Sequence, residues 1–270
     1  MKKTKIAVLI SLISILLLLF CATTGPGGKK SLILVSTDQE VSIGQEFSAQ
    51  IDTTNPISQD TIVQNYVNDV GQKIARISDR ADLDYHFSVI DTPIVNAFAC
   101  PGGFIYIYTG LLEIMDNEAQ LAGVLAHEIS HVVARHGVKR LQKALGLQVL
   151  LSIALGESSE ITQNAVTLGA VVLLQAHSRE NEFEADEFGT YYMTNAGYNP
   201  EGMVQLQQKF LELSQGGQPG FFEKIMATHP PSAERVKRIE NQIAGYDPEI
   251  KNRSFKAEEY QKIKSRLKKD

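Results

Sequence analysis

Apolar residues recur at helical spacing along most of this chain, and one region departs from that pattern. The spacing predicts helices over residues 38–51 and 61–78. Residues 85–91 and 104–110 are instead rich in β-branched and aromatic residues, and a Cys-Pro-Gly-Gly turn at 100–103 separates them. We therefore expect a hairpin or a pair of short strands here, in an α+β chain that is otherwise mainly α-helical.

The segment after these strands predicts one long helix. Asp116 or Asn117 is suited to cap its start, and the helical pattern continues to about Leu145. Two apolar segments follow, at 144–155 and 165–176, and each is too short to span a bilayer. We interpret them as buried core helices, with segments that dip into a membrane as the alternative.

Helical spacing resumes at residue 178 and ends at Gly197, and a Gly-rich loop at 216–220 precedes the last core helix. The final twenty residues hold eight Lys or Arg against three Asp or Glu, which predicts a basic helical tail. A solvated helix is the first interpretation of this tail, and contact with an anionic membrane the alternative. The predicted organisation is a leader or anchor, a flexible tether, one folded domain and the tail: residues 1–21, 22–35, 36–245 and 246–270.

The first residues predict export from the cytoplasm. Positive charge in MKKTK precedes an apolar run from Ile6 to Phe20, and Cys21 follows directly. This order resembles a bacterial lipoprotein signal, in which Cys21 is acylated, although Phe20 stands where such signals usually carry a small residue. An uncleaved membrane anchor is the alternative, and both place the rest of the chain outside the cytoplasm.

Composition narrows the class of partner. The formal net charge is −5 and the isoelectric point is about 5.7. Nucleic-acid binding favours a basic face, so we expect no nucleic-acid partner. A hydrophobic content of 43% is enough for a folded domain with its own core.

The candidate chemistry lies in the predicted long helix, in the segment HEISH at 127–131. Residues four apart share one helix face, so His127 and His131 can hold a single metal ion. Glu128 points about 100° round the helix and can act on the attacking water without binding the metal. This is the arrangement of the HExxH zinc hydrolases. A polar patch on an ordinary helix is the alternative, against which the apolar neighbours argue.

A catalytic zinc site usually takes three protein ligands. His136 lies off the face that His127 and His131 share, whereas Glu182 offers a carboxylate from a second helix. Asp186 lies four residues after Glu182 and is suited to accept the second ring N–H of a ligand histidine. Four other residues are interpreted as solvated, structural or exposed: Glu180, Glu184, His86 and His177.

Several segments together resemble zinc metallopeptidase family forty-eight, which includes HtpX, BepA, LoiP, the Oma-type proteases and the CAAX prenyl protease. The family pattern of HExxH followed by ExxAD reads HEISH at 127–131 and EFEAD at 182–186. Further segments match the family: Asn96-Ala97-Phe98, residues 101–112, Arg135-His136-Gly137, Ser178-Arg179, and His229-Pro230-Pro231 with Arg235. The chain most resembles the short, exported, lipid-anchored members such as LoiP.

This resemblance implies a zincin-like metallopeptidase domain, with a small sheet or hairpin flanking the active-site cleft. One Zn²⁺ per chain would bind His127, His131 and Glu182, and Arg235 would support the site. His229 would stabilise the oxyanion, or would bind the metal in a resting state.

The resemblance also implies a substrate-binding strand. FIYIYTG at 104–110 would be the edge strand along which an extended peptide pairs, and a strand closed within its own sheet is the alternative. The residues of this substrate site would be Asn96, Ala97, Phe98, Gly103, Phe104, Ile105 and Tyr106.

We therefore expect a zinc metalloendopeptidase facing the periplasm of a bacterial envelope, held at the membrane by an N-terminal lipid or anchor. Glu128 and His229 are its expected catalytic residues. Misfolded or membrane-associated envelope polypeptides are its expected substrates, and other envelope proteins its partners. Two alternatives stay open: a zinc-binding, chaperone-like envelope protein without proteolysis, and a hydrolase of another bond, such as an amide of the cell wall.

Overall fold

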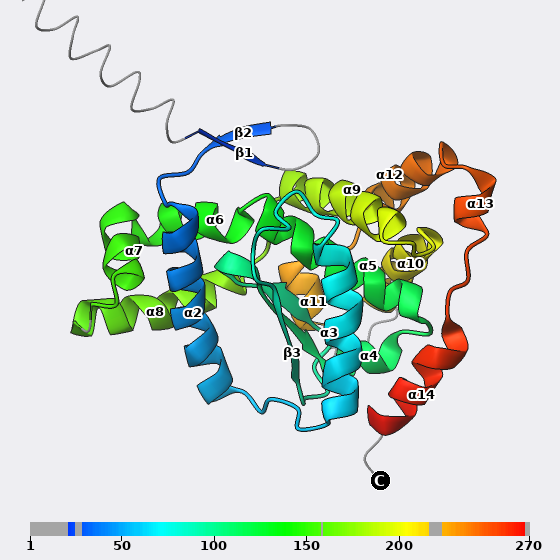
Figure 1. The fold of residues 1–270 in the computed structure, drawn as a ribbon, viewed down its shortest axis with the longest axis horizontal. Helices are drawn as coiled ribbons and strands as arrows, with labels where there is room; N and C mark the ends of the chain where they lie inside the picture. The colour runs from blue at the N-terminus through cyan, green and yellow to red at the C-terminus, as the bar shows by residue number, and fades with distance from the viewer. Residues whose placement is uncertain (1–20, 25–28, 158, 216–222, 268–270) are drawn as a thin grey trace, which may run out of the picture.

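The computed structural model describes residues 21–24, 29–157, 159–215 and 223–267. Within them, helices dominate and a small mixed sheet lies between two groups of helices (Figure 1). This confirms the predicted class, α+β and mainly α-helical. The apolar run at 6–20 and the loop at 216–220 lie outside the described residues.

The strands are β1 (Cys21–Thr24), β2 (Lys29–Leu32), β3 (His86–Ile90), β4 (Ala97–Ala99) and β5 (Phe104–Tyr108), with the short helix η1 (Pro101–Gly103) before β5. The helices between residues 37 and 173 are α2 (Thr37–Thr54), α3 (Thr61–Ala75), α4 (Thr109–Ile114), α5 (Glu118–Val133), α6 (His136–Leu145), α7 (Leu147–Ala154) and α8 (Glu160–Leu173). The remaining helices are α9 (Arg179–Asn195), α10 (Glu201–Gln215), α11 (Glu223–Thr228), α12 (Ala233–Ala244), α13 (Pro248–Lys251) and α14 (Ala257–Leu267). In Figure 1, α2, α7 and α8 lie together on one side of the sheet, and α9, α10 and α12 lie on the other.

The sheet corrects the predicted strand pairing. β5 pairs in parallel with β3 on one side and antiparallel with β4 on the other. The predicted pair of short strands is confirmed, but the hairpin is wrong because β3 and β5 run parallel. The prediction that 104–110 forms an edge strand is also wrong, since β5 is the central strand of the three. The two outer strands of this sheet are β3 and β4.

The predicted long helix is two helices with a bend between them. Asn117 caps the first, as one of the two expected residues, and its side chain accepts a hydrogen bond from the backbone N–H of Gln120. The bend lies at Arg135, whose φ of 54° and ψ of 35° are left-handed, a conformation uncommon outside glycine. The Nε of Arg135 lies 2.8 Å from the fully buried carboxylate of Glu40, and its Nη2 donates to the carbonyl oxygen of Val35 at 2.8 Å. These contacts hold the bend in place.

The two short apolar segments form α7 and α8, which pack against α2 through one face each. Leu150, Ile153 and Val172 are buried in this contact. Five large apolar side chains of this region are exposed: Leu155, Ile161, Leu168, Val171 and Leu174. The prediction of buried core helices is therefore confirmed for only one face. A search of the described helices finds none with the length and apolar character to cross a bilayer.

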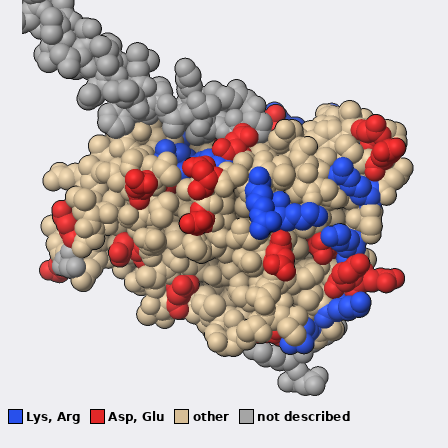
Figure 2. Space-filling model, viewed as in Figure 1, with Lys and Arg blue, Asp and Glu red and all other residues tan. Residues whose placement is uncertain are grey.

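The packed structure extends past the predicted domain limits at both ends. Ile33 and Val35 are buried, so the fold begins before the predicted start at residue 36, and β1 pairs with β2 inside the predicted tether. At the other end, Tyr260 of α14 is buried and donates to the carbonyl oxygen of Leu112 at 2.7 Å. The predicted helical tail thus packs on the domain through Tyr260 and Ile263, while most of the other residues of α14 are exposed to solvent. On the face that Figure 2 shows, basic side chains are interspersed with acidic ones.

Every residue of α5 is buried, and α9 crosses it at Gly189. A Cβ added at Gly189 would lie 3.0 Å from the backbone N of His127. We expect Gly189→Ala to push α9 away from α5, and to lower the free energy of unfolding by about 1–3 kcal/mol through overpacking. Because α9 carries Glu182, the variant should also bind metal more weakly. Urea denaturation and a metal titration measure the two effects.

Gly245→Ala is the matched control for this substitution. A Cβ at Gly245 meets its nearest atom, the carbonyl oxygen of Gln242, at 3.7 Å, an ordinary contact distance. Equal losses of stability in the two variants would contradict the close approach of α9 to α5 as the cause.

Candidate active site

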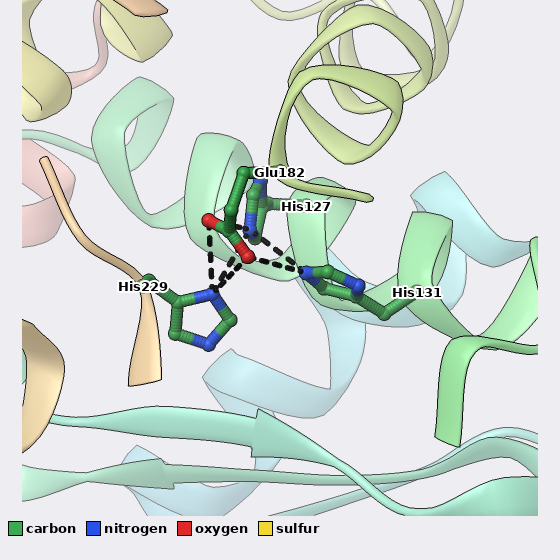
Figure 3. A group of neighbouring side chains, drawn as sticks. All are labelled: His127, His131, Glu182 and His229. Carbon is green, nitrogen blue, oxygen red and sulfur yellow. Dashed lines mark hydrogen bonds and ion pairs between the residues drawn. The ribbon is translucent and has the colours of Figure 1, made fainter. Parts of the chain in front are cut away.

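Three segments of the chain bring together four side chains of types that can bind a metal ion. α5 carries His127 and His131 on one face, and the first turn of α9 carries Glu182. Ser178 caps α9 by accepting a hydrogen bond from a backbone N–H, which sets the start of that helix. His229 follows the end of α11. Figure 3 shows the four side chains pointing toward a common centre.

The distances among these donor atoms match a single metal ion. Nε2 of His127 and Nε2 of His131 are 3.1 Å apart, and oxygens of Glu182 lie 3.5 and 3.4 Å from them. Nδ1 of His229 lies 3.3 Å from Nε2 of His127 and 3.1 Å from Oε1 of Glu182. Ligands about 2.0–2.1 Å from a tetrahedral ion are about 3.3 Å from one another. One ligand atom from each of the four residues lies within 4.8 Å of the others, close enough for them to share one ion.

The charge of the cluster also fits a cation. Glu128, Glu182 and Asp186 are buried here beside one buried guanidinium, that of Arg235. With neutral imidazoles the carboxylates outnumber the cation, and buried charge without compensation is costly. A divalent cation at the centre would supply the missing positive charge. The residues thus fit a metal ion in both geometry and chemistry.

The protonation states follow from burial and from the neighbouring charges. Burial alone lowers the pKa of His127, but the carboxylates of Asp186 and Glu182 raise that pKa to about 10. Burial holds the pKa of His131 well below its ordinary value, so its imidazole is neutral. Burial acts to raise the pKa of Glu182, but His229 and Arg235 outweigh it and keep that pKa well below its usual range. His131 and Glu182 thus present a lone pair and a carboxylate, and His127 would have to lose a proton to bind a metal ion.

Arg235 and Asp186 connect two of the candidate ligands, His127 and Glu182, to each other. Oδ1 of Asp186 lies 3.0 Å from Nδ1 of His127. Arg235 donates to both carboxylate oxygens of Asp186 at 2.7 Å, and its Nη1 lies 2.8 Å from Glu182. The structure thus places both predicted supporting residues in contact with candidate ligands, and Arg235 contacts two carboxylates at once.

Glu128 lies beside the donor set without joining it. Its Oε1 is 3.4 Å from Nε2 of His229, and burial raises the pKa of its carboxyl. A pocket of about 20 Å³ adjoins Glu128, with Ala97 and Ile225 among its lining residues. This volume admits about one water molecule.

The structure separates the predicted substrate-binding residues into two groups. Ala97 lines the pocket beside Glu128, and Asn96 accepts a hydrogen bond from Thr228 at 3.1 Å. Phe98 stacks on Tyr106 with ring centroids 5.1 Å apart, inside the core shared with α2. Peptide pairing along Phe104, Ile105 and Tyr106 is wrong for this structure, because both edges of β5 are occupied. Gly103 lies before β5 in η1, against the backbone of Asp84.

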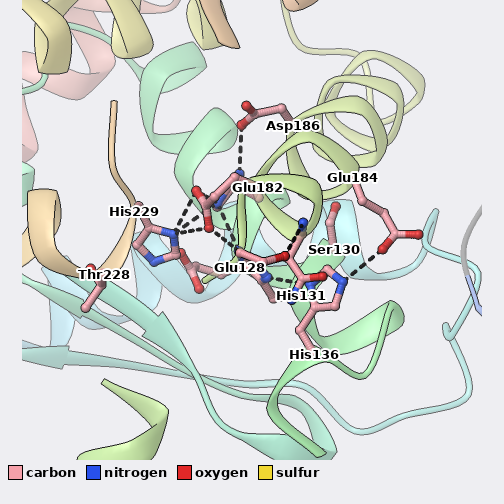
Figure 4. Close-up of polar contacts among 12 residues, drawn as sticks. Glu128, Ser130, His131, His136, Glu182, Glu184, Asp186, Thr228 and His229 are labelled. Atoms are coloured by element: carbon pink, nitrogen blue, oxygen red, sulfur yellow. Dashed lines mark hydrogen bonds and ion pairs between the residues drawn. The ribbon is translucent and has the colours of Figure 1, made fainter. Parts of the chain in front are cut away.

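Three residues that the sequence interpretation placed outside the site contact it. Nδ1 of His136 lies 2.7 Å from Nδ1 of His131, and its Nε2 lies 2.9 Å from Oε2 of Glu184 (Figure 4). Glu184 is only 9% exposed, so its interpretation as solvated is wrong. His177 stacks on His131 with ring centroids 3.9 Å apart. His136 belongs to the family-like segment Arg135-His136-Gly137, which is the signal that marked it, whereas no spacing pattern marks His177.

Comparisons with known proteins agree with this site. A family model described as peptidase family M48 matches residues 61–243. The β-barrel assembly-enhancing protease of Escherichia coli K12 is 27% identical over 228 residues, which cover 80% of this chain and 46% of that protein. The mitochondrial metalloendopeptidase OMA1 of Schizosaccharomyces pombe is 34% identical over 178 residues, covering 65% of this chain and 51% of that protein.

The metalloprotease LoiP of Escherichia coli K12 is 33% identical over 155 residues, covering 56% of this chain and 59% of that protein. The chain thus spans about half the length of the curated relatives that it matches. The family model covers well over half of the chain, including HEISH at 127–131 and EFEAD at 182–186. The resemblance seen in the sequence is confirmed, and the chain belongs to peptidase family M48.

Proposed function

We propose that this protein is a zinc-dependent metalloendopeptidase that hydrolyses peptide bonds in polypeptides of the bacterial cell envelope. The observation that carries the proposal is the close approach of the side chains of His127, His131 and Glu182, which lie 3.1–3.5 Å apart, with Glu128 beside them. Membership of peptidase family M48 supports a peptidase, and the matched relatives are named as proteases.

Zinc is the metal that this donor set favours. Two imidazole nitrogens and one carboxylate oxygen make a three-residue ligand set of the catalytic zinc type, with the fourth position left for the reaction. His127, His131 and Glu182 would hold the ion, which supplies Lewis acidity at the peptide carbonyl and lowers the pKa of water.

Glu128 carries the proton transfers in this proposal. Its carboxylate accepts a proton from the attacking water and then delivers it to the leaving amine. Burial supports this role, because a raised pKa brings the carboxyl closer to neutral pH, where it can both accept and donate. The Asp186 carboxylate meanwhile holds the ring of His127 from the side opposite the metal.

We infer that the substrate pairs with β4, in place of the strand predicted from sequence. β4 is the outer strand beside the donor set, and Ala97 on it lines the pocket next to Glu128. An extended peptide added along this edge would pass the site by β-augmentation.

The geometry further supports a resting state in which His229 occupies the fourth corner of the donor set. The pocket of about 20 Å³ is far too small for a peptide. The hydrogen bond from Thr228 to Asn96 fastens the end of α11 next to β4. Substrate entry therefore requires α11 and His229 to move, after which His229 is free to stabilise the oxyanion.

The proposed location rests on the first residues of the chain. The apolar run from Ile6 to Phe20, followed by Cys21, supports a lipid or membrane anchor at the envelope. Mass spectrometry of the mature N-terminus tests it, because a diacylglyceryl group on Cys21 establishes the lipid and an intact Met1 excludes it.

Metal removal tests the proposed activity. We expect the zinc-loaded protein to cleave unfolded casein, to lose cleavage when a chelator removes the metal, and to regain it with one equivalent of Zn²⁺. Casein and purified cell-wall fragments are assayed in parallel. Release of wall fragments without casein cleavage would favour the hydrolase of another bond. Zinc binding with neither reaction would favour the chaperone-like alternative.

A further inference from the structure

We propose that His136 and Glu184 are positioning residues, which together set the tautomer and the ring orientation of the metal ligand His131. This inference rests on the proposed metal centre and adds two residues that the ligand set and its expected support, Asp186 and Arg235, do not include.

The bend after α5 is what brings His136 to the site. In an unbroken helix, a residue five positions after His131 lies about 140° away round the axis. The left-handed backbone of Arg135 interrupts the helix between α5 and α6 and turns His136 back toward His131. As a result Nδ1 of His136 lies 2.7 Å from Nδ1 of His131, a hydrogen-bonding distance between two buried rings.

Metal binding at Nε2 of His131 would determine which ring nitrogens of His131 and His136 carry a proton. Nε2 of His131 faces Glu182 at 3.4 Å and is the nitrogen that would bind the ion. A neutral imidazole that binds metal through Nε2 carries its proton on Nδ1. That N–H donates to Nδ1 of His136, which must offer a lone pair and therefore carries its own proton on Nε2.

Glu184 fixes this second tautomer. Nε2 of His136 lies 2.9 Å from Oε2 of Glu184, and an ionised carboxylate can only accept. The N–H of His136 therefore points at Glu184, and its lone pair points at His131. With His136 alone in the other tautomer, two N–H groups would face each other at the contact between the rings.

Each of the two proposed ligand histidines is thus connected to a carboxylate through its Nδ1, the ring nitrogen that would not bind the metal. Asp186 contacts His127 directly at 3.0 Å, whereas Glu184 reaches His131 through His136. His136 is 2% exposed and Glu184 9% exposed, so the contacts are shielded from competing water.

Zinc affinity measured against a competing chromophoric chelator tests the proposal without relying on proteolysis. His136→Leu keeps a side chain of similar volume but removes the acceptor nitrogen Nδ1. We expect its zinc dissociation constant to rise about 10–100-fold. His136→Asn retains an acceptor oxygen near the position of Nδ1 and should recover most of the affinity. Glu184→Gln should weaken binding to an intermediate degree. His86→Leu, an exposed histidine of β3 away from the cluster, is the control and should bind like wild type.

A second readout follows the proton itself. In zinc-loaded protein labelled with ¹⁵N-histidine, we expect a slowly exchanging Nδ1–H signal from His131, lost in His136→Leu and kept in His136→Asn. Wild-type zinc affinity in folded His136→Leu would overturn the proposal. So would equal weakening in His136→Leu and His136→Asn, which indicates only a packing role. If His136→Leu does not fold, wild-type affinity in Glu184→Gln would overturn it instead.

These outcomes are separable from failure of the proposed function. A wild-type protein that binds zinc and cleaves nothing would refute the peptidase while leaving the affinity series interpretable. A wild-type protein that cleaves casein, with zinc affinities unchanged across the series, would refute only the positioning role.

Discussion

We expect Glu128→Gln to retain its bound zinc and to lose peptide cleavage. Glutamine has the same shape as glutamate but cannot accept and return a proton at neutral pH. Removal of a general base of this kind lowers the rate by about 10²–10⁴-fold. The metal should stay, because Glu128 contacts His229 and is not one of the three proposed ligands. Zinc content by elemental analysis and cleavage of labelled casein are measured on the same preparation.

Glu180→Gln is the matched control for this substitution. It makes the same chemical change on α9 at an exposed side chain, two residues before the proposed ligand Glu182. We expect it to bind zinc and to cleave casein like wild type. If Glu128→Gln lost its zinc together with its activity, Glu128 would be a ligand or a structural residue, and its role as the base would be refuted.

Arg235→Leu is expected to lower the free energy of unfolding by about 3–5 kcal/mol, the usual loss when one partner of a buried ion pair is removed. Arg235 is 2% exposed and contacts the carboxylates of Asp186 and Glu182. Zinc would compensate the charge of Glu182, but Asp186 contacts Nδ1 of His127, the ring nitrogen that faces away from the proposed metal position. Urea denaturation should therefore show a deficit in the metal-free protein that zinc reduces but does not remove.

Two further variants separate the charge effect from a simple loss of packing. Arg179→Leu changes an arginine whose side chain is 73% exposed, and its stability should stay within about 0.5 kcal/mol of wild type. Asp186→Asn added to Arg235→Leu removes the uncompensated charge and should restore part of the stability, as a double-mutant cycle measures. An equal loss for Arg179→Leu and Arg235→Leu would refute the buried ion pair as the cause.

The parts of this site that were predictable from sequence are those that depend on spacing within one helix. His127 and His131 share a face of α5 because they are four residues apart, and Glu182 and Asp186 share a face of α9 for the same reason. The association of the two segments came from the family pattern, since spacing alone does not place one helix beside another.

The parts that were not predictable depend on the backbone between elements and on contacts between distant segments. His136 was excluded because an unbroken helix turns it away from His131, and only the left-handed Arg135 reverses that. The solvated interpretation of Glu184 failed because its partner, His136, is on a different helix. The position of β5 depends on β4, a three-residue strand too short to show a periodic pattern.

The bend at Arg135 also connects the segment that precedes α2 to the candidate metal site. Arg135 holds the carbonyl oxygens of Val35 and Ser36 at 2.8 and 3.4 Å, at the point where the N-terminal segment runs into α2. A displacement of that segment would act on Arg135 and, through the bend, on the ring of His136. The packing of the segment before α2 and the geometry of the candidate site are therefore coupled through one arginine.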